Sequence, residues 1–353
     1  MNRKSYLHAI GEIIFAIAVI VLVYFLLQFL ERRNTRAAIE LTEASTQKIE
    51  EVQADNYGTV VLGTRQYILS HPVKTYLFLG TDASGNEDGT GEEYRGSMAD
   101  VLMLAVIDQE EQSYGFLQLN RDTITRVPLM QVDGSANASA RLQLCTAHWY
   151  GGDKKASCEN TVTTVSEMLG GIPIDGYYAL SMDAMEKLNQ AVGGVTVTFS
   201  EDLTELDPAM EEGATITLTD EQAVKLLHAR YEMTDDRNTE RMERQRIFFD
   251  AFLGQVKERQ EGDNDFVIKL YDSLHPYATE DININEITKL MHQADGYTSK
   301  GVYTIDGESE IGQRLGDGLD HWEFYMDEAS LDSTMQALFP LVYEGEWEEE
   351  YEE

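Results

Sequence analysis

Three short apolar stretches stand out between residues 76 and 119, and each has a charged residue at one end. They are residues 76–81 before Asp82, residues 101–107 after Asp100, and residues 114–119 before Arg121. Their length and their content of Leu, Val, Phe and Tyr predict buried β-strands. Because α/β sheets bind ligands at the ends of their strands, we expect the two carboxylates and the arginine to converge on one site. Their chemistry suits a metal-bound phosphate.

Farther along the chain, segments with helical and strand-like patterns alternate. The pattern predicts a helix over 161–169, a strand over 177–182, a helix over 183–192, a strand over 195–199, and a helix that begins in capping-box form at Thr219 and Gln222. Glycine pairs follow the first two helices and are typical of helix ends. Strands separated by single helices favour an α/β fold, and we expect a central mixed β-sheet covered by helices on both faces.

An arginine-rich cluster occupies residues 228–246 of this acidic chain. Asn238 or Thr239 can cap a helix there. The predicted apolar stripe of this helix consists of Met242, Phe249, Leu253 and Val256. Arg241 and Gln245 are i, i+4 neighbours beside the stripe and can point at one ligand. Guanidinium groups match pairs of phosphate oxygens, which suggests a pyrophosphate, whereas a surface network of ion pairs is the alternative.

The apolar pattern near the start of the chain is of a different kind. Residues 13–30 are uncharged and apolar except for Gln28, and with Ala9 and Ile10 the segment can cross a hydrocarbon core of about 30 Å. No A-x-A-like cleavage site follows, so we predict an uncleaved transmembrane signal anchor over residues 9–30 rather than a secretory signal peptide. Basic residues flank the segment on both sides, so the positive-inside rule leaves its orientation open.

The composition limits the possible binding partners and completes the predicted domain organisation. The 353 residues include 63 Asp and Glu against 27 Lys and Arg, a formal net charge of -36. This charge disfavours nucleic-acid binding, which needs cations at the phosphates. We predict a cytoplasmic segment (1–8), the anchor (9–30), a helical stalk (31–56), one domain (57–343) and an acidic disordered tail (344–353).

Several of these motifs occur in an order that resembles a known family. They are residues 79–82, 99–104, 120–123, 147–152, 188–195, the pair Ala229-Arg230, and residues 241–245. In this order they resemble the motifs of the LytR-CpsA-Psr family, over about residues 74–259. A set of motifs in the correct order is far more specific than any one of them.

The resemblance implies a single-pass cell-membrane protein with its domain on the extracytoplasmic side. Such a protein transfers a glycopolymer, a teichoic acid or a capsular polysaccharide, from an undecaprenyl-pyrophosphate carrier to peptidoglycan. By this resemblance Asp82 and Asp100 hold Mg²⁺ and, with Arg121, are the catalytic candidates. The residues implied to bind the pyrophosphate are Arg121, Arg230, Arg241, Gln245 and, if protonated, His228. One of the two carboxylates is the candidate base for the acceptor hydroxyl.

Two departures from the family pattern keep other functions open. Met98 stands where the family commonly has an arginine, and His228 stands in place of the first of two arginines. The alternatives are a non-catalytic protein that binds prenyl phosphate or scaffolds envelope enzymes, and a polyprenyl pyrophosphate hydrolase. Cys145 and Cys158 can form a disulfide or remain separate buried thiols, and with His148 alone they are too few ligands for zinc.

Overall fold

The computed structural model describes residues 57–82, 97–130, 136–181, 184–229, 238–263, 266–282 and 297–346. Within these ranges no helix is long and apolar enough to cross a membrane. The predicted anchor and stalk, residues 9–30 and 31–56, lie outside the described residues.

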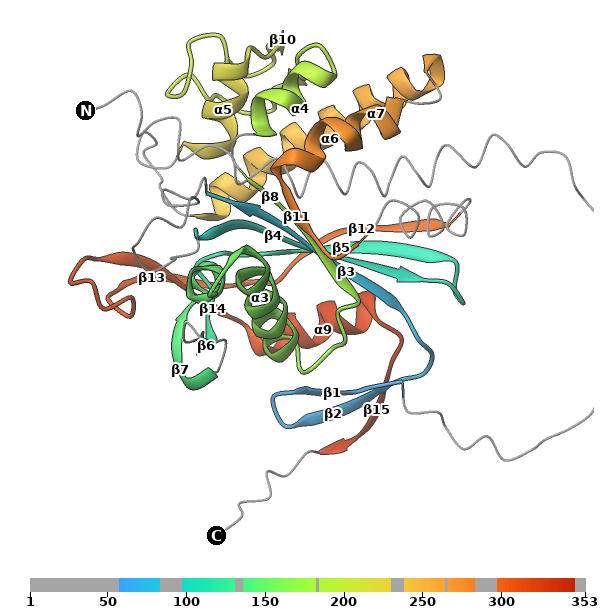
Figure 1. The fold of residues 1–353 in the computed structure, drawn as a ribbon, viewed down its shortest axis with the longest axis vertical. Helices are drawn as coiled ribbons and strands as arrows, with labels where there is room; N and C mark the ends of the chain where they lie inside the picture. The colour runs from blue at the N-terminus through green and yellow to red at the C-terminus, as the bar shows by residue number, and fades with distance from the viewer. Residues whose placement is uncertain are drawn as a thin grey trace, which may run out of the picture.

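A six-stranded mixed sheet forms the centre of the molecule (Figure 1). Its strands, in spatial order, are β11 (Ala278–Glu280), β8 (Gly176–Ser181), β3 (Lys74–Thr81), β4 (Ala99–Asp108), β5 (Ser113–Leu119) and β12 (Thr298–Thr304). The pairs β3–β8 and β5–β12 are parallel, and the other neighbouring pairs are antiparallel. The three apolar stretches of the sequence are thus the adjacent strands β3, β4 and β5, as predicted.

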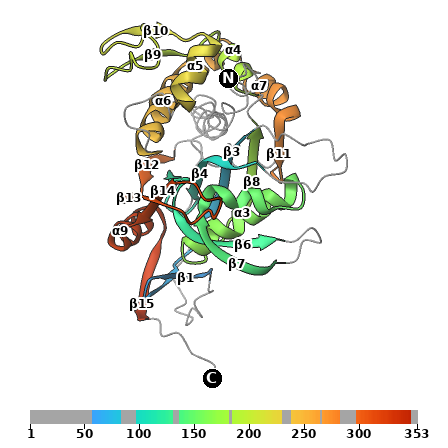
Figure 2. The ribbon, with the colours of Figure 1, turned by 90° about the vertical axis from the view of Figure 1, so that its left-hand side faces the viewer.

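Helices cover both faces of this sheet, as Figure 2 shows. One layer contains α4 (Met185–Ala191), α5 (Asp220–His228), α6 (Asn238–Gly262) and α7 (Phe266–Leu274), and the other contains α3 (Lys154–Met168) and α9 (Glu328–Leu338). Along β3, Tyr76 and Phe78 lie in the core beneath the first layer, and Leu77 and Leu79 lie in the core beneath the second. Because both faces are buried, these strands are apolar throughout rather than alternating.

Smaller elements surround the main sheet. A three-stranded sheet contains β1 (Thr59–Leu62), β2 (Arg65–Leu69) and β15 (Leu341–Glu346). The strand pairs are β6 (Ile124–Met130) with β7 (Ala136–Gln143), β9 (Thr196–Thr198) with β10 (Thr215–Thr217), and β13 (Gly307–Gly312) with β14 (His321–Met326); the 3₁₀ helices are η1 (Leu144–Tyr150) and η3 (His275–Tyr277). Since β15 ends at Glu346, residues 344–346 belong to a sheet and not to the disordered tail that the sequence predicts.

Local hydrogen bonds explain where the helices begin. The predicted capping box is present in α5: the Thr219 hydroxyl accepts from the Gln222 amide at 3.2 Å, and the Gln222 side chain accepts from the Thr219 amide at 3.1 Å. Helix α3 begins at Lys154, earlier than the pattern predicts, because the Asp153 carboxylate caps it by accepting from the Ala156 amide at 2.8 Å. It ends before Gly170, whose φ of +80° suits a glycine.

Helix α6 packs on the sheet through residues that the sequence pattern only partly identified. Val256 is buried as predicted, and Phe248 and Phe252, which the predicted stripe omits, are fully buried. Arg244 is also buried: its Nε donates to the Leu226 carbonyl at 3.2 Å and its Nη2 donates to the Ala229 carbonyl. Burial, and secondly the charge of Arg241, lower the pKa of Arg244 to about 10. Arg244 therefore fastens α6 to the end of α5.

We expect Arg244→Ala to lower the free energy of unfolding by about 2–4 kcal/mol, because it leaves two buried carbonyl groups without their charged donor. Arg246→Ala is the matched control, since Arg246 is exposed and its guanidinium pairs with Glu243 of the same helix at 2.6 Å. That change should cost no more than about 0.5 kcal/mol. Urea denaturation of both variants checks this, and equal losses would show that Arg244 is not a structural clamp.

The two cysteines do not form a disulfide. Both side chains are buried, and their neighbours differ: Cys145 Sγ lies 3.3 Å from Arg121 Nη2, and Cys158 Sγ lies 3.7 Å from His148 Nε2. His148 lies in η1, and its Nδ1 donates to the Ser97 carbonyl at 2.7 Å. Burial lowers the pKa of His148 to about 4, although the bond to Ser97 acts in the opposite direction. The imidazole is therefore neutral at physiological pH and joins η1 to the segment before β4.

This buried histidine should make stability depend on pH. In the unfolded chain the imidazole has its ordinary pKa of 6.5, so between pH 6.5 and about 4 the unfolded state binds the proton and the folded state does not. Stability is present above pH 6.5 and falls by on the order of 3 kcal/mol as the pH drops to about 4. The difference in unfolding free energy between wild type and His148→Gln, measured across this range, should show that fall. A difference that stays constant with pH would contradict it.

Candidate functional site

The site forms where three strands of the central sheet end or begin at the same edge. Asp82 directly follows β3, Asp100 is the second residue of β4, and Arg121 lies just after β5. The register of β3 and β4 shifts between Gly80 and Thr81, and the backbone N–H of Asp82 donates to the Met98 carbonyl at 3.2 Å. Such a bulge re-aims a side chain, and here the Asp100 carboxylate meets α6.

Asp100 is the centre of the site. Its side chain is buried, one carboxylate oxygen pairs with Nη1 of Arg121, and the other lies 3.4 Å from Nη1 of Arg241. Arg241 is only 2% exposed. Two guanidinium groups from distant parts of the sequence therefore share one carboxylate. A buried arrangement of this kind is strongly destabilised when one partner is removed.

Two asparagines orient Arg241. The Asn238 side-chain oxygen accepts from Arg241 Nε at 2.9 Å and from Nη2 at 2.5 Å, so both are satisfied on one edge of the guanidinium. Asn238 Nδ2 in turn donates to the side-chain oxygen of Asn120 at 2.9 Å. Asn120 precedes Arg121 in the turn after β5, and its side-chain oxygen also accepts from the Asp122 amide at 3.0 Å. This chain of bonds links the start of α6 to the turn that presents Arg121.

Gln245 lies one helical turn beyond Arg241, as the i, i+4 spacing predicts. It is buried, and its side-chain oxygen accepts from Gln118 Nε2 of β5 at 3.3 Å. Its own Nε2 has no hydrogen-bond partner among the described residues. A buried amide donor without a partner costs free energy, so this group is available to a ligand oxygen.

Arg121 has three different kinds of neighbour. Besides Asp100, its Nε lies 3.4 Å from the Asp122 carboxylate, and its Nη2 contacts Met98 Sδ and Cys145 Sγ, each at 3.3 Å. Met98 thus brings a thioether to the guanidinium. Sulfur is a weak acceptor, so these contacts can be exchanged for a stronger oxygen acceptor.

The structure brings together Asp100, Arg121, Arg241 and Gln245 of the predicted site, and places the Asp82 backbone beside them. Arg230 lies outside the described residues, and so does the side chain of His228, the last residue of α5. Two arginines of the cluster at residues 228–246 have different surroundings. Arg241 faces the site, whereas Arg244 donates hydrogen bonds to the end of α5.

Sequence reasoning missed three polar residues that build the site. Asn238 was expected only as a helix cap, and neither Asn120 nor Gln118 was singled out. The one available signal was their position, because Gln118 and Asn120 lie at the end of an apolar strand where a polar residue has no packing role.

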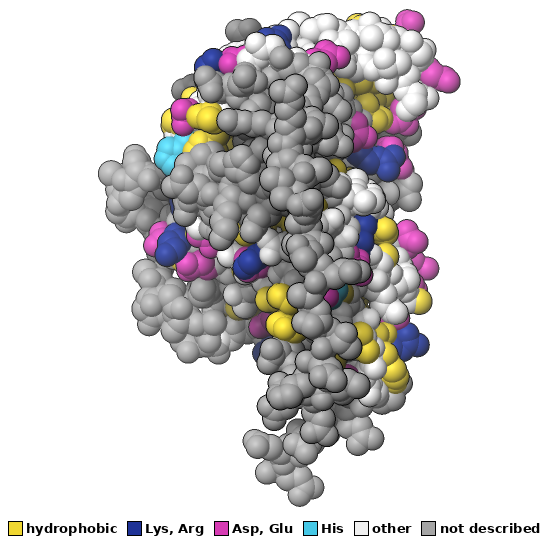
Figure 3. Space-filling view, turned by 90° about the vertical axis from the view of Figure 1, so that its right-hand side faces the viewer, with side chains coloured by type: hydrophobic (Ala, Val, Ile, Leu, Met, Phe, Trp, Pro, Cys, Tyr) yellow, Lys and Arg dark blue, Asp and Glu magenta, His cyan; other side chains and the backbone are white. Residues whose placement is uncertain are grey.

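The guanidiniums of the site already face carboxylates. Asp100 lies against Arg121 and Arg241, and Asp122 lies against Arg121, so an added anion must compete with a carboxylate or be accompanied by a cation. The donor set suits such a cation, since carboxylates such as Asp82 and Asp100 are the hard oxygen ligands of Mg²⁺. On the face of the molecule in Figure 3, the described basic side chains lie beside acidic ones rather than in a basic patch.

Comparisons with known proteins agree with this architecture. A protein of Halalkalibacterium halodurans, polyisoprenyl-teichoic acid–peptidoglycan teichoic acid transferase TagU, is 30% identical over 165 residues, which are 46% of this chain and 49% of that protein. Biofilm regulatory protein A of Streptococcus mutans is 26% identical over 239 residues, which are 66% of this chain and 56% of that protein. The chain therefore spans about half the length of the curated relatives it matches.

Solved structures share the fold. The structure of TagT bound to LI-WTA matches with a TM-score of 0.53 and 18% sequence identity, and the match covers 75% of this chain and 90% of that chain. At this identity the likeness supports the fold alone. The model of the LytR_cpsA_psr family matches residues 27–339, which is most of the chain. The chain therefore belongs to the LytR_cpsA_psr family.

Proposed function

We propose that the protein is a membrane-anchored phosphotransferase that attaches an undecaprenyl-pyrophosphate-linked glycopolymer to peptidoglycan. The observation that carries the proposal is the buried Asp100 carboxylate held between the guanidiniums of Arg121 and Arg241. Two guanidiniums converging on one anion at the end of a sheet form a geometry suited to a pyrophosphate. The relative named teichoic acid transferase TagU and the family membership support the same reaction class.

In this proposal the pyrophosphate takes the place of Asp100 between the two arginines. Arg121 and Arg241 bind its oxygens, and the unpartnered Nε2 of buried Gln245 donates a further hydrogen bond. Arg230 is proposed to add a third guanidinium. Asp82 and Asp100 would hold Mg²⁺, which when bound neutralises charge on the phosphates.

The transfer makes one phosphodiester and breaks one pyrophosphate bond. The acceptor hydroxyl of peptidoglycan attacks the phosphorus that is attached to the glycan, and polyprenyl monophosphate leaves. The hydroxyl proton goes to a carboxylate, for which Asp82 and Asp100 are the candidates. The arginines stabilise the charge that develops on the transferred group.

Localisation is part of the proposal. The apolar segment 9–30 would anchor the chain by a single pass, and the domain would lie on the extracytoplasmic side, where peptidoglycan is found. The acidic surface is compatible with that location, and so are the two cysteines, since both are buried.

Two observations leave a second candidate function open. One relative of similar identity is named Biofilm regulatory protein A, and Met98 stands where we expect an arginine from the resemblance to the family. A protein that binds prenyl pyrophosphate without transferring it would use the same arginines. Hydrolysis of the same bond, with water as the acceptor, is a third outcome that the assay below distinguishes.

The full chain in detergent should transfer a labelled glycan from a polyprenyl pyrophosphate to peptidoglycan fragments when Mg²⁺ is present. Release of phosphorylated glycan without transfer would identify a hydrolase. Tight lipid binding with neither product would identify a binding protein. Each of these two results contradicts the proposed phosphotransferase.

Arg121→Ala should weaken binding of polyprenyl pyrophosphate and slow transfer by about 2–4 kcal/mol, because it removes a charge-assisted donor from a preorganised site. Arg246→Ala, which removes an exposed arginine from the same region, should leave both unchanged. Isothermal titration and the transfer assay measure these effects. Equal losses in the two variants would indicate diffuse attraction by basic residues.

A further inference from the structure

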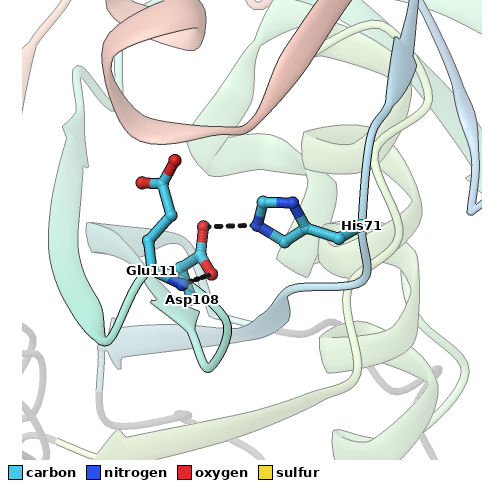
Figure 4. Close-up of side chains that lie close together, drawn as sticks. All are labelled: His71, Asp108 and Glu111. Carbon is cyan, nitrogen blue, oxygen red and sulfur yellow. Dashed lines mark hydrogen bonds and ion pairs between the residues drawn. The ribbon is translucent and has the colours of Figure 1, made fainter. Parts of the chain in front are cut away.

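A second cluster of ligand-type side chains lies at the opposite end of β4 from the proposed active site. His71 comes from the connection between β2 and β3, Asp108 is the last residue of β4, and Glu111 lies in the turn to β5. One nitrogen or oxygen from each of the three lies within 4.8 Å of the others. Figure 4 shows the imidazole pointing at the Asp108 carboxylate, with the Glu111 carboxylate beside it. Asp108 lies eight positions after Asp100 along β4, a distance of about 26 Å.

The cluster has a fixed centre. Asp108 is 1% exposed, and its Oδ1 accepts from the backbone amides of Glu110 at 3.0 Å and Glu111 at 2.8 Å. Its Oδ2 lies 2.8 Å from Nε2 of His71. The carboxylate is therefore oriented by the turn itself, and its free edge is directed at the imidazole.

The far side of the imidazole is also held in place. Nδ1 of His71 lies 3.1 Å from Ser70 Oγ and 3.9 Å from the Glu110 carboxylate, and Ser70 Oγ in turn donates to the Pro340 carbonyl at 3.2 Å. The ring is therefore oriented through Nδ1, and Nε2 is directed at the Asp108 carboxylate, which is how a partner on one ring nitrogen orients a metal-binding histidine.

Ser113 gives an independent indication of a ligand. It pairs directly with Asp108 in the β4–β5 ladder, so the two side chains lie on the same face of the sheet. Ser113 is buried, and its Oγ has no hydrogen-bond partner among the described residues. A buried hydroxyl next to a fixed carboxylate can serve as a further oxygen ligand.

We propose that His71, Asp108 and Glu111, with Ser113 Oγ nearby, form a site for a divalent cation of the zinc class. An imidazole nitrogen with carboxylate oxygens selects Zn²⁺ or its neighbours over Mg²⁺, which prefers oxygen alone. Bonds of about 2.1 Å place tetrahedral ligands about 3.4 Å apart, so the His71–Asp108 pair opens by only about half an ångström. Glu111 turns to the ion from Lys300, which now lies 3.4 Å from it.

The bound ion would act on stability rather than on the transfer reaction. It would join the connection before β3 to the β4–β5 turn. The proposal is independent of the proposed function, since none of its ligands belongs to the pyrophosphate site.

The test is a titration of Zn²⁺ into the full chain, purified without a histidine tag, in excess Mg²⁺ to occupy the acidic surface. We expect one saturable site and a rise in the melting temperature on binding. Glu111→Gln should weaken Zn²⁺ binding at least about tenfold, and its half-exposed side chain makes misfolding a small risk. Glu310→Gln is the control, because Glu310 is an exposed carboxylate of β13 outside the cluster, and this variant should bind as wild type does.

A His–Asp pair elsewhere in the chain provides a second control. His321 lies 2.9 Å from Asp317, and among the described residues no third His, Cys, Asp or Glu joins this pair to form a cluster. His321→Gln should therefore also bind Zn²⁺ as wild type does. Three outcomes overturn the proposal: no saturable binding, which leaves only the contact between His71 and Asp108; equal losses in Glu111→Gln and Glu310→Gln; or displacement of Zn²⁺ by the excess Mg²⁺.

Discussion

The ion pairs of one buried carboxylate, Asp100, constrain the arrangement of the whole candidate site. Removing an arginine and a carboxylate from water is costly, and the cost is recovered only when the geometry satisfies both groups. Asp100 meets this requirement twice, with Arg121 from the end of β5 and Arg241 from the first turn of α6. The start of α6, the turn after β5 and the start of β4 can therefore occupy only one relative position. A site built in this way is preorganised before any ligand binds.

The central sheet provides the support that such a site needs. Because helices bury both of its faces, strands β3, β4 and β5 cannot slip in register without moving apolar side chains out of two cores at once. The bulge beside Asp100 is the local exception. Alternation from Leu102 and Leu104 would point Asp100 towards α3 and α9, and the bulge turns it towards α6 instead. Arg244, fastened to the end of α5, fixes the helix from the other side.

Much of the fold and part of the site could be predicted from the sequence. The apolar stretches locate the buried strands, and the capping box of Thr219 and Gln222 locates the start of α5. Both signals are local in the sequence. The contacts of Asn238 with Arg241 and Asn120 depend on how α6 lies on the sheet, which no local pattern encodes. The different fates of Arg241 and Arg244 likewise follow from packing. The roles of the predicted site residues in binding and catalysis remain predictions.

Asp100 has two roles in the proposed function. It holds the two arginines in place, and it receives Mg²⁺ when the pyrophosphate displaces it from between them. The decisive measurement is the affinity for inorganic pyrophosphate as Mg²⁺ is increased, in wild type and in Asp100→Asn. We expect Mg²⁺ to tighten the binding of pyrophosphate at least about tenfold in wild type and to have little effect in the variant, because a neutral amide is a poor ligand for a hard cation. An equal effect of Mg²⁺ on both proteins would contradict it.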